Sequence, residues 1–325
     1  MNNRIALITG AGMLGAHTAR RLLDAGWEVV LVDRTLHRTY LADVVGHSSR
    51  LTLIEGDLLS ESVWATLPEP EVVIHTAALI AARAQSDPLA ALDINVRATF
   101  RLALWAAGVG ARRFIAVSTW GVHDMDARGP FDEDSAIVSQ HLTYYGATKM
   151  AMEELLGAVE AATDLEVVIV RPSVMYGYGP HLGGALGSQA IETIVIEALG
   201  GRDVVIPRNL LSQTELLYVD DAAAALAAAA SVQLAASFER FILGSQQTTT
   251  ADELAETLRK LFPEVSVRVD DSSQGMSPPG RDEPIDATRA VQALGIEVPR
   301  SRENGLAAFV DVLRSSSAAP QVASH

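Results

Sequence analysis

The first half of the chain alternates between two patterns of hydrophobic and polar positions. Short apolar runs that are rich in β-branched residues and bounded by turn residues predict buried strands. These runs are Ile5–Thr9, Glu28–Asp33, Leu51–Ile54, Val72–Ile74, Phe114–Ser118 and Val167–Arg171. Amphipathic stretches between the runs predict helices, at Leu14–Ala25, Pro88–Ala107 and Tyr144–Ala161. This alternation predicts an α/β fold, a doubly wound parallel sheet with helices on both faces.

The pattern changes after Arg171. A glycine-rich stretch at residues 177–187 predicts a connection, followed by helices at Ile191–Leu199 and Ala251–Leu261 and a strand at Phe241–Leu243. We expect residues 1–172 to form the doubly wound domain, with a later segment, about 205–245, returning to it. Residues 173–314 then form mainly a smaller C-terminal lobe. The small polar residues 315–325 predict a disordered tail.

Length and composition narrow the class of protein. The 325 residues suit two domains or one large α/β unit with an appendage. Hydrophobic residues at 49% and charged residues at 20% exclude a disordered or fibrous chain. The absence of cysteine excludes disulfides, thiolate metal sites and a cysteine nucleophile, and it suits a reducing cytoplasm. The eight histidines form no metal-ligand spacing, so no metal is predicted.

Charge and hydropathy narrow the partners. The net charge of −15 argues against nucleic acid or an anionic membrane surface. The N-terminal apolar run is too short for a signal peptide, and no stretch is long enough to span a bilayer. The expectation is a cytoplasmic protein that acts on a small molecule.

A glycine-rich turn follows the first predicted strand. In Gly10-Ala-Gly12-Met-Leu-Gly15, the first glycine allows a tight turn, the second lets a pyrophosphate approach the backbone, and the third lets helix and strand pack closely. The following helix offers N–H donors to phosphate. Asp33 ends the next strand and suits the ribose 2′-hydroxyl of NAD, although Arg34 beside it can pair with the 2′-phosphate of NADP. The pattern predicts a Rossmann-type NAD site.

A second pattern suggests acid–base chemistry. Tyr145 and Lys149 are spaced to share one face of a helix. A nearby ammonium and the charge of an oxidised nicotinamide would lower the tyrosine pKa from about 10. Thr119 ends a strand, where its hydroxyl is placed to hold a substrate oxygen. The spacing alone is more typical of a partly buried tyrosine and a solvated lysine, and only its occurrence together with the glycine turn and the strand-end hydroxyl predicts catalysis.

Together these motifs resemble the extended short-chain dehydrogenase/reductase family, of the NAD-dependent epimerase/dehydratase type. The resemblance covers about residues 4–312 and keeps the order of the family's motifs. Besides those above, they are Gly56-Asp57-Leu58, His75-Thr-Ala-Ala78, Asp87-Pro88 with Asn95, Arg171-Pro172, Tyr176-Gly177 and Tyr218-Val-Asp-Asp221. The resemblance implies that Asp57 contacts adenine, that Lys149 binds the nicotinamide ribose, and that Tyr145 is the acid/base. It also implies a homodimer built through the Pro88–Ala107 and Tyr144–Ala161 helices.

The candidate site therefore has three parts. The predicted catalytic residues are Thr119, Tyr145 and Lys149. The predicted cofactor residues are Gly10, Gly12, Met13, Leu14, Gly15, Asp33, Arg34, Asp57, Leu58, Ala77, Ala78, Asn95, Ser118, Tyr145, Lys149, Pro172 and Val174. The residues adjoining the catalytic segments, Thr119, Trp120, Met175, Tyr176, Tyr178 and His181, are expected to line the substrate pocket, although Trp120 and Met175 equally suit the core.

Departures from the family pattern guide the interpretation of the substrate. The glycine turn is one residue shorter than usual, and His123 stands where nucleotide-sugar members commonly carry tyrosine. Val174 and Thr214 replace an asparagine and an arginine that would bind a substrate diphosphate, which removes charge-assisted contacts. We therefore expect hydride transfer between NAD and an alcohol or carbonyl carbon of a small, non-nucleotide substrate. The alternatives are a sugar or nucleotide-sugar epimerase or dehydratase with tightly bound NAD, and a non-catalytic NAD sensor.

Three further positions have plain structural interpretations. His75 is expected to support the cofactor loop rather than transfer protons. Asp220 and Asp221 are expected to cap the alanine-rich helix that follows them. Arg281 equally suits an anionic substrate group or a surface ion pair.

Overall fold

The core of the protein is a seven-stranded parallel sheet. A computed structural model describes residues 4–127, 131–138, 143–180, 186–211, 214–272 and 282–316. The strands are β1 (Ile5–Thr9), β2 (Glu28–Asp33), β3 (Leu51–Glu55), β4 (Val72–His75), β5 (Arg113–Val117), β6 (Glu166–Pro172) and β10 (Phe238–Leu243). Their order is β10-β6-β5-β4-β1-β2-β3, and every neighbouring pair is parallel. The predicted doubly wound α/β fold is confirmed.

Both faces of this sheet are buried. Alternate residues of each strand belong to different hydrophobic clusters: Ala6 and Ile8 of β1 face one side, and Leu7 faces the other. The same division holds in β5, where Ile115 and Phe114 fall in separate clusters. Two buried faces explain why the strands are apolar throughout instead of alternating with polar residues.

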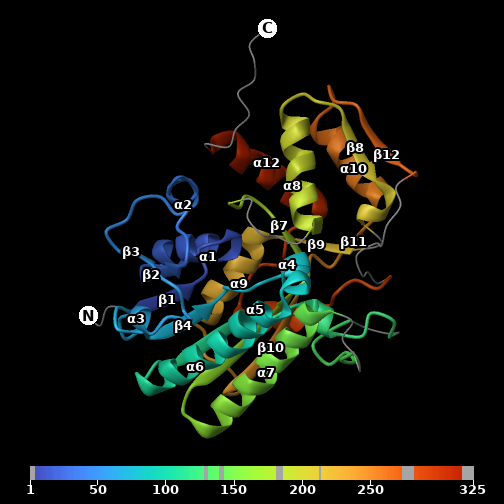
Figure 1. The fold of residues 1–325 in the computed structure, drawn as a ribbon. Helices are drawn as coiled ribbons and strands as arrows, with labels where there is room; N and C mark the ends of the chain where they lie inside the picture. The colour runs from blue at the N-terminus through green and yellow to red at the C-terminus, as the bar shows by residue number, and fades with distance from the viewer. Residues whose placement is uncertain are drawn as a thin grey trace.

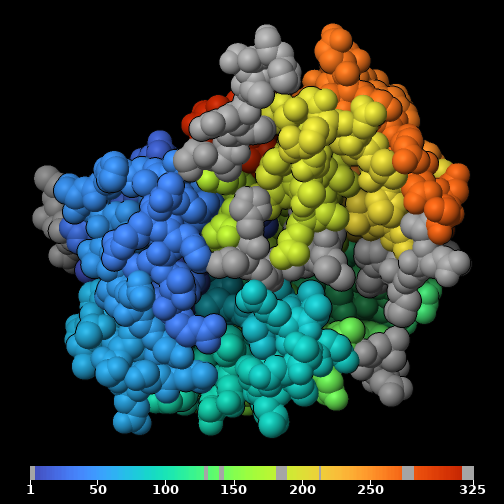
Figure 2. All heavy atoms as spheres, turned by 45° about the horizontal axis from the view of Figure 1, so that its top comes forward, coloured from blue at the N-terminus to red at the C-terminus, as the bar shows by residue number. Residues whose placement is uncertain are grey.

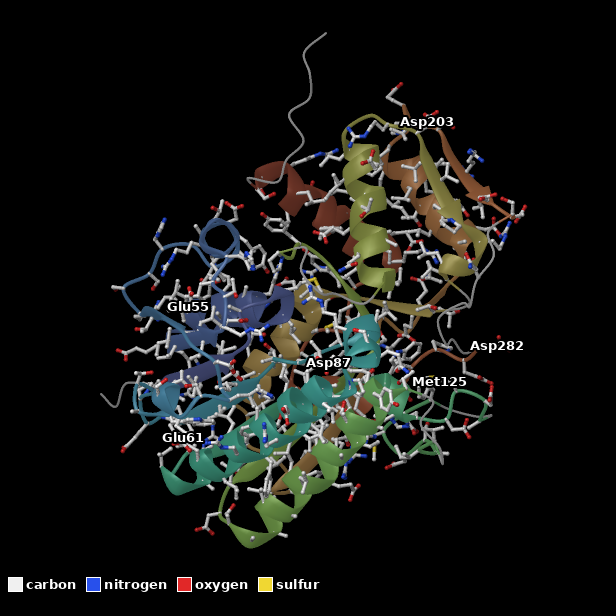
Figure 3. The ribbon with its side chains drawn as sticks, in the orientation of Figure 1. Glu55, Glu61, Asp87, Met125, Asp203 and Asp282 are labelled. Atoms are coloured by element: carbon white, nitrogen blue, oxygen red, sulfur yellow. The ribbon has the colours of Figure 1, made fainter. Side chains whose placement is uncertain are left out.

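Helices cover the two faces in separate layers (Figure 1). One layer contains α1 (Met13–Asp24), α2 (Arg38–Val44) and α9 (Val219–Ala229). The other contains α5 (Pro88–Leu92), α6 (Thr99–Gly108) and α7 (Tyr144–Ala162). Asp87, labelled in Figure 3, begins α5 by accepting a hydrogen bond from the Ala90 amide at 3.0 Å. Two short helices, α3 (Glu61–Trp64) and α4 (Ala81–Ser86), lie in the connections.

One predicted helix differs from the structure. The stretch Pro88–Ala107 is interrupted between α5 and α6 by a π-helical segment, Asp93–Ala98. The segment contains Asn95, whose side chain is fully buried and bonds to the loop after β4 and to Thr148 of α7. The irregular turn thus places a polar side chain where a regular helix pattern predicts only packing.

The smaller lobe is built from the second half of the chain. Its helices are α8 (Leu186–Leu199), α10 (Ala251–Leu261) and α12 (Arg302–Ser315), whereas α11 (Thr288–Leu294) packs against α9 and β10. It also contains a three-stranded sheet of β7 (Val174–Tyr176), β9 (Thr214–Tyr218) and β11 (Thr248–Thr249), and a two-stranded sheet of β8 (Val204–Pro207) and β12 (Val267–Asp270). In Figure 2 this lobe, yellow to orange, stands beside the blue and teal N-terminal half.

The chain returns to the large sheet after building part of the lobe. Strand β10 pairs with β6 from Phe238 opposite Val167 to Leu243 opposite Pro172. At the other end of the lobe, α12 includes Ser315, the first residue of the predicted tail, and residues 317–325 lie outside the described residues.

The acidic pair before the alanine-rich helix does not cap it. Tyr218 is the N-cap of α9, and Asp220 and Asp221 lie in the first turn. Asp220 forms an ion pair with Arg21 of α1 at 2.6 Å, and Asp221 accepts the backbone N–H of Arg300 at 2.8 Å. The carboxylates still meet the positive end of the helix dipole, but they also tie α9 to α1 and to the segment before α12.

Candidate active site and cofactor cradle

The glycine turn after β1 is closely packed. Gly10 has φ of +100°, and a Cβ added there would lie 2.6 Å from the Ala77 nitrogen and from Thr76 Oγ1. A Cβ on Gly15, in the first turns of α1, would lie 1.8 Å from the Gly10 oxygen. The first and third glycines are therefore required by the contact between loop, helix and neighbouring strand.

The second glycine faces open space. Gly12 is the N-cap of α1 with no side-chain cap, and a Cβ added there would meet no protein atom within 4 Å. A half-buried helix N-terminus with room beside its backbone suits a phosphate group, because the first N–H groups of a helix have no partner within it. The shortened glycine turn therefore keeps a cradle that a dinucleotide fits.

Two aspartates lie beside this cradle. Asp33, at the end of β2, accepts the Ala11 amide through Oδ2 at 2.6 Å and the Thr35 amide through Oδ1 at 3.2 Å. Asp57 follows β3 and accepts the Leu59 amide at 2.9 Å. Asp33 thus braces the glycine turn and keeps acceptor capacity for a ribose hydroxyl, while Arg34 is exposed.

His75 supports the cradle from below. Its Nδ1 lies 2.6 Å from Thr9 Oγ1, and its Nε2 lies 2.8 Å from Thr99 Oγ1. Burial, and then the charge of Lys149, lower the pKa of His75 to about 3. The ring is therefore neutral and joins the ends of β1 and β4, in agreement with the supporting role expected for it.

Asn95, a predicted cofactor residue, bonds to the loop after β4 and to Thr148 of α7. Its Oδ1 accepts the Leu79 amide at 2.7 Å, and its Nδ2 donates to the Leu79 oxygen at 2.9 Å and to Thr148 Oγ1 at 3.0 Å. Because the side chain is fully buried and these bonds occupy its amide, Asn95 fixes the loop that carries Ala77 and Ala78. Both alanines are half-buried and remain predicted cofactor contacts.

Tyr145 and Thr119 meet at the carboxyl edge of the sheet. Tyr145 lies in the first turn of α7, whose N-cap Thr143 accepts the Gly146 amide at 3.1 Å. The phenol is hydrogen-bonded to the hydroxyl of Thr119, which follows β5. Burial raises the pKa of Tyr145 to about 12, although the bond to Thr119 lowers it. Desolvation therefore dominates the pKa of Tyr145, and its lowering by Lys149 together with an oxidised nicotinamide stays a prediction.

Lys149 lies one turn further along α7 and is buried. Its Nζ donates a hydrogen bond to the Val117 oxygen at 2.7 Å, and it lies 5.9 Å from the centre of the Tyr145 ring. Burial lowers the pKa of Lys149 to about 8, and the charge of Glu153 opposes that fall. Glu153 was missed by the sequence analysis, although its spacing of four residues from Lys149 on the same helix was a usable signal.

The aromatic side chains expected in the substrate pocket are buried and packed against other residues. Trp120 packs against Phe131 with ring centroids 5.7 Å apart. Tyr176 packs between Tyr218 and Phe309, and the Tyr178 hydroxyl donates to Asp43 of α2 at 2.9 Å. These contacts do not test whether the three residues line a substrate pocket, and that role stays a prediction.

The remaining predicted positions fall into three groups. Leu14, Ser118 and Pro172 are buried beside the strand ends, and Met13, Leu58, Val174 and Met175 are half-buried. Thr214 is fully buried in β9 opposite Thr249, so packing fills that position. His181 and Arg281 lie outside the described residues. None of these positions is tested as a ligand contact, and each stays a prediction.

The chain belongs to the NAD dependent epimerase/dehydratase family. The family profile matches residues 6–244, which include the cradle, Thr119, Tyr145 and Lys149. The resemblance seen in the sequence is thereby confirmed, and so is NAD as the cofactor of this class.

Individual relatives act on nucleotide sugars. The chain is 32% identical over 194 residues to UDP-glucose 4-epimerase 3 of Oryza sativa subsp. japonica, an alignment that covers 56% of this chain and 51% of the relative. The chain therefore spans about half the length of that relative. Among solved structures, MoeE5 in complex with UDP-glucose and NAD is 27% identical with a TM-score of 0.76, covering 95% of this chain and 98% of that one. UDP-glucuronic acid 4-epimerase from Bacillus cereus has a TM-score of 0.79 at 22% identity, covering 95% and 99%, and supports the fold.

These comparisons change the expected substrate class. They favour the epimerase or dehydratase alternative over oxidation of a small, non-nucleotide substrate. In the described part of the chain, no helix combines the length and apolarity needed to cross a bilayer, and no cluster of three or more acidic or histidine side chains is arranged to hold a metal.

Replacement of Gly12 by alanine should separate cofactor binding from folding. The protein has room for the added methyl, so Gly12→Ala should cost at most about 1 kcal/mol of stability. The same methyl enters the space expected for the pyrophosphate, so NAD affinity should fall at least about tenfold. Calorimetric NAD titration and thermal unfolding measure the two effects.

Gly15→Ala is the matched control. Its methyl would collide with the Gly10 oxygen, so this variant should lose both stability and NAD binding. Unchanged NAD affinity in Gly12→Ala would contradict the position assigned to the pyrophosphate.

Proposed function

We propose that the protein is an NAD-dependent epimerase or dehydratase that acts on a nucleotide sugar, with a UDP-sugar 4-epimerase reaction as the first choice. The observation that carries the proposal is the hydrogen-bonded pair of Tyr145 and Thr119 above the buried ammonium of Lys149. This group stands at the same sheet edge as the open cradle at Gly12. Membership of the family and the UDP-sugar chemistry of its relatives support the choice of substrate.

In this proposal, each side chain of the site has a separate role in the reaction. Tyr145 takes the proton of a sugar hydroxyl, and Thr119 orients that oxygen toward the phenol. NAD, when bound, supplies a hydride acceptor and a positive charge beside the phenol. That charge matters because burial holds the pKa of Tyr145 near 12 in the protein alone. Lys149 adds its own charge from the buried side and, in this proposal, holds the nicotinamide ribose.

A second candidate rests on one specific observation. Thr214 is fully buried and Val174 is aliphatic, so neither position offers a charged donor to a substrate diphosphate. The lack of a charged donor at these two positions favours a second reaction, the net oxidation of a small alcohol with release of NADH. In the first proposal, other residues of the smaller lobe must bind the diphosphate.

Assays with UDP-sugars should distinguish the two candidates. We expect UDP-glucose or UDP-glucuronic acid to be converted to an isomer or dehydrated product, detected by proton NMR, without accumulation of absorbance at 340 nm. Stoichiometric NADH with a free alcohol, and no change of the UDP-sugars, would favour the second candidate and reject the first.

Replacement of Tyr145 by phenylalanine should remove turnover while leaving the cofactor bound. Loss of a general acid/base costs about 10²–10⁴ in kcat. Tyr144→Phe is the matched control, because Tyr144 is the adjacent residue and is 50% exposed. NAD content and kcat of both variants measure the effect. Wild-type turnover in Tyr145→Phe would contradict the assignment.

We further propose that the protein forms a homodimer through α5, α6 and α7. Leu89 and Leu92 of α5 are 74% and 48% exposed, and Leu104 of α6 is 47% exposed. The exposed face of α7 carries the small residues Ala147 and Ala151, which permit close approach of a second helix. Exposed apolar side chains on adjacent helices of one layer support an interface with a second copy.

A charge placed on this face should dissociate the dimer. Leu89→Asp combined with Leu104→Asp should give a monomer in light scattering at micromolar concentration, because each carboxylate would be buried without a partner. Val298→Asp, at a 60% exposed position near α12, should leave the dimer intact. A wild-type monomer would reject the proposal.

A further inference from the structure

A cluster of buried charges lies beneath the catalytic lysine. Glu153 is fully buried on α7, one turn beyond Lys149. Arg171 of β6 donates to its carboxylate through two bonds, from Nε to Oε1 at 3.0 Å and from Nη2 to Oε2 at 2.6 Å. Arg240 of β10 adds a third bond, from Nε to Oε2 at 3.2 Å. One carboxylate is thus held by arginines from two neighbouring strands of the large sheet, β6 and β10.

His123 completes the cluster as a neutral ring. Its Nε2 lies 3.1 Å from Arg171 Nη1, and its Nδ1 lies 2.9 Å from the Ser135 oxygen. A guanidinium only donates, so Nε2 accepts and Nδ1 carries the proton that is donated to Ser135. Burial, and then the charge of Arg171, lower the pKa of His123, which agrees with a neutral ring.

Among the described groups that face Lys149, only one carries a negative charge. Tyr145 is a phenol with a raised pKa, and His75 of β4 is neutral. The direct partner of the ammonium is a backbone oxygen, that of Val117 in β5. Burial raises the pKa of Glu153, but the hydrogen bonds and the charge of Arg171 lower it by more. The pKa is therefore below its ordinary value, and this carboxyl is ionised. Among the described groups around Lys149, Glu153 is the anion.

We propose that Glu153 is a positioning residue that keeps Lys149 charged, and that Arg171 and Arg240 hold its carboxylate in place. A buried ammonium whose partner is a neutral carbonyl loses hydration that the carbonyl replaces only in part. The field of a carboxylate one helical turn away offsets that loss. Because the carboxylate bonds to the arginines and not to Lys149, the ammonium keeps its bond to β5 and its place beside Tyr145.

The sign of the effect follows from the charges. Burial lowers the pKa of Lys149 to about 8, and Glu153 acts in the opposite direction. Removal of the carboxylate therefore lets Lys149 lose its proton at a lower pH, and the uncompensated Arg171 pushes the same way. Removal of Arg240 does the opposite, because it takes a positive charge from the cluster and leaves Glu153 in place.

The lysine content of the chain makes this charge directly measurable. Lys149 and Lys260 are the only lysines in the sequence, and Lys260 is exposed beside Glu256. In protein labelled with [¹³Cε]lysine, two side-chain signals are expected, and Lys260→Arg assigns them. The pH titration of the Lys149 signal then reports the protonation of the ammonium in the intact chain without substrate.

Three variants test the proposal. We expect Glu153→Gln to move the Lys149 titration about 1 pH unit or more to lower pH. Glu154→Gln removes an exposed carboxylate at the next position of α7 and should leave the titration unchanged. Arg240→Gln, at a half-exposed side chain, should move the titration to higher pH. Circular dichroism and thermal unfolding establish that each variant is folded.

Opposite shifts in Glu153→Gln and Arg240→Gln would establish the role of the carboxylate. If Glu153→Gln does not fold, Arg240→Gln decides the matter, since its side chain is half-exposed and its effect has the opposite sign. Equal titration of Lys149 in the wild type and Arg240→Gln, or in the wild type and folded Glu153→Gln, would overturn the proposal.

The consequence for catalysis rests on the proposed function. The decline of kcat on the alkaline side should begin at lower pH in Glu153→Gln than in the wild type, and Glu153→Asp should restore most of the profile. A shifted Lys149 titration with no turnover of any UDP-sugar would reject the proposed function while leaving the role of Glu153 intact.

Discussion

The hydrogen bond from the Lys149 ammonium to the Val117 oxygen determines how the proposed active site is assembled. An ammonium that is buried must find an acceptor, and the last carbonyl of β5 provides it. This bond fixes the first turns of α7 against the end of β5. Tyr145 and Thr119 then meet because one belongs to that turn and the other follows that strand. The charge beneath the phenol and the position of the phenol therefore have the same structural origin.

Much of the architecture could be predicted because it depends on short-range patterns. Buried parallel strands are continuous apolar runs, and the three glycines have roles that follow from backbone geometry alone. Gly10 and Gly15 meet close neighbours, and Gly12 faces open space. The approximate bounds of β10 were also visible in the sequence. These features depend on residues close together in the chain.

The features that sequence missed depend on contacts between distant segments. Asp220 and Asp221 have the sequence of a helix start, but Arg21 and Arg300 give them their roles. Tyr176 and Tyr178 adjoin the predicted catalytic segments in sequence, and their rings are buried against Tyr218 and Tyr40, which are distant in the chain. Asn95 is a predicted cofactor residue, and its bonds to the loop after β4 and to Thr148 were not indicated by the sequence pattern. The hydrophobic periodicity of a sequence does not show which distant segment a given side of a strand or turn will contact.

Strand β10 makes the folding of the large domain depend on the second half of the chain. It pairs along the whole of β6 and places its last residues beside Pro172, at the edge where catalysis is expected. A fragment ending near residue 172 would lack this partner and would expose the backbone of an apolar strand, a known route to aggregation. In a fragment beginning near residue 173, Phe241, Ile242 and Leu243 would lose the surface that buries them. The large sheet is complete only after β7, α8, β8 and β9 of the smaller lobe have been synthesised, so the two parts are expected to fold as one cooperative unit.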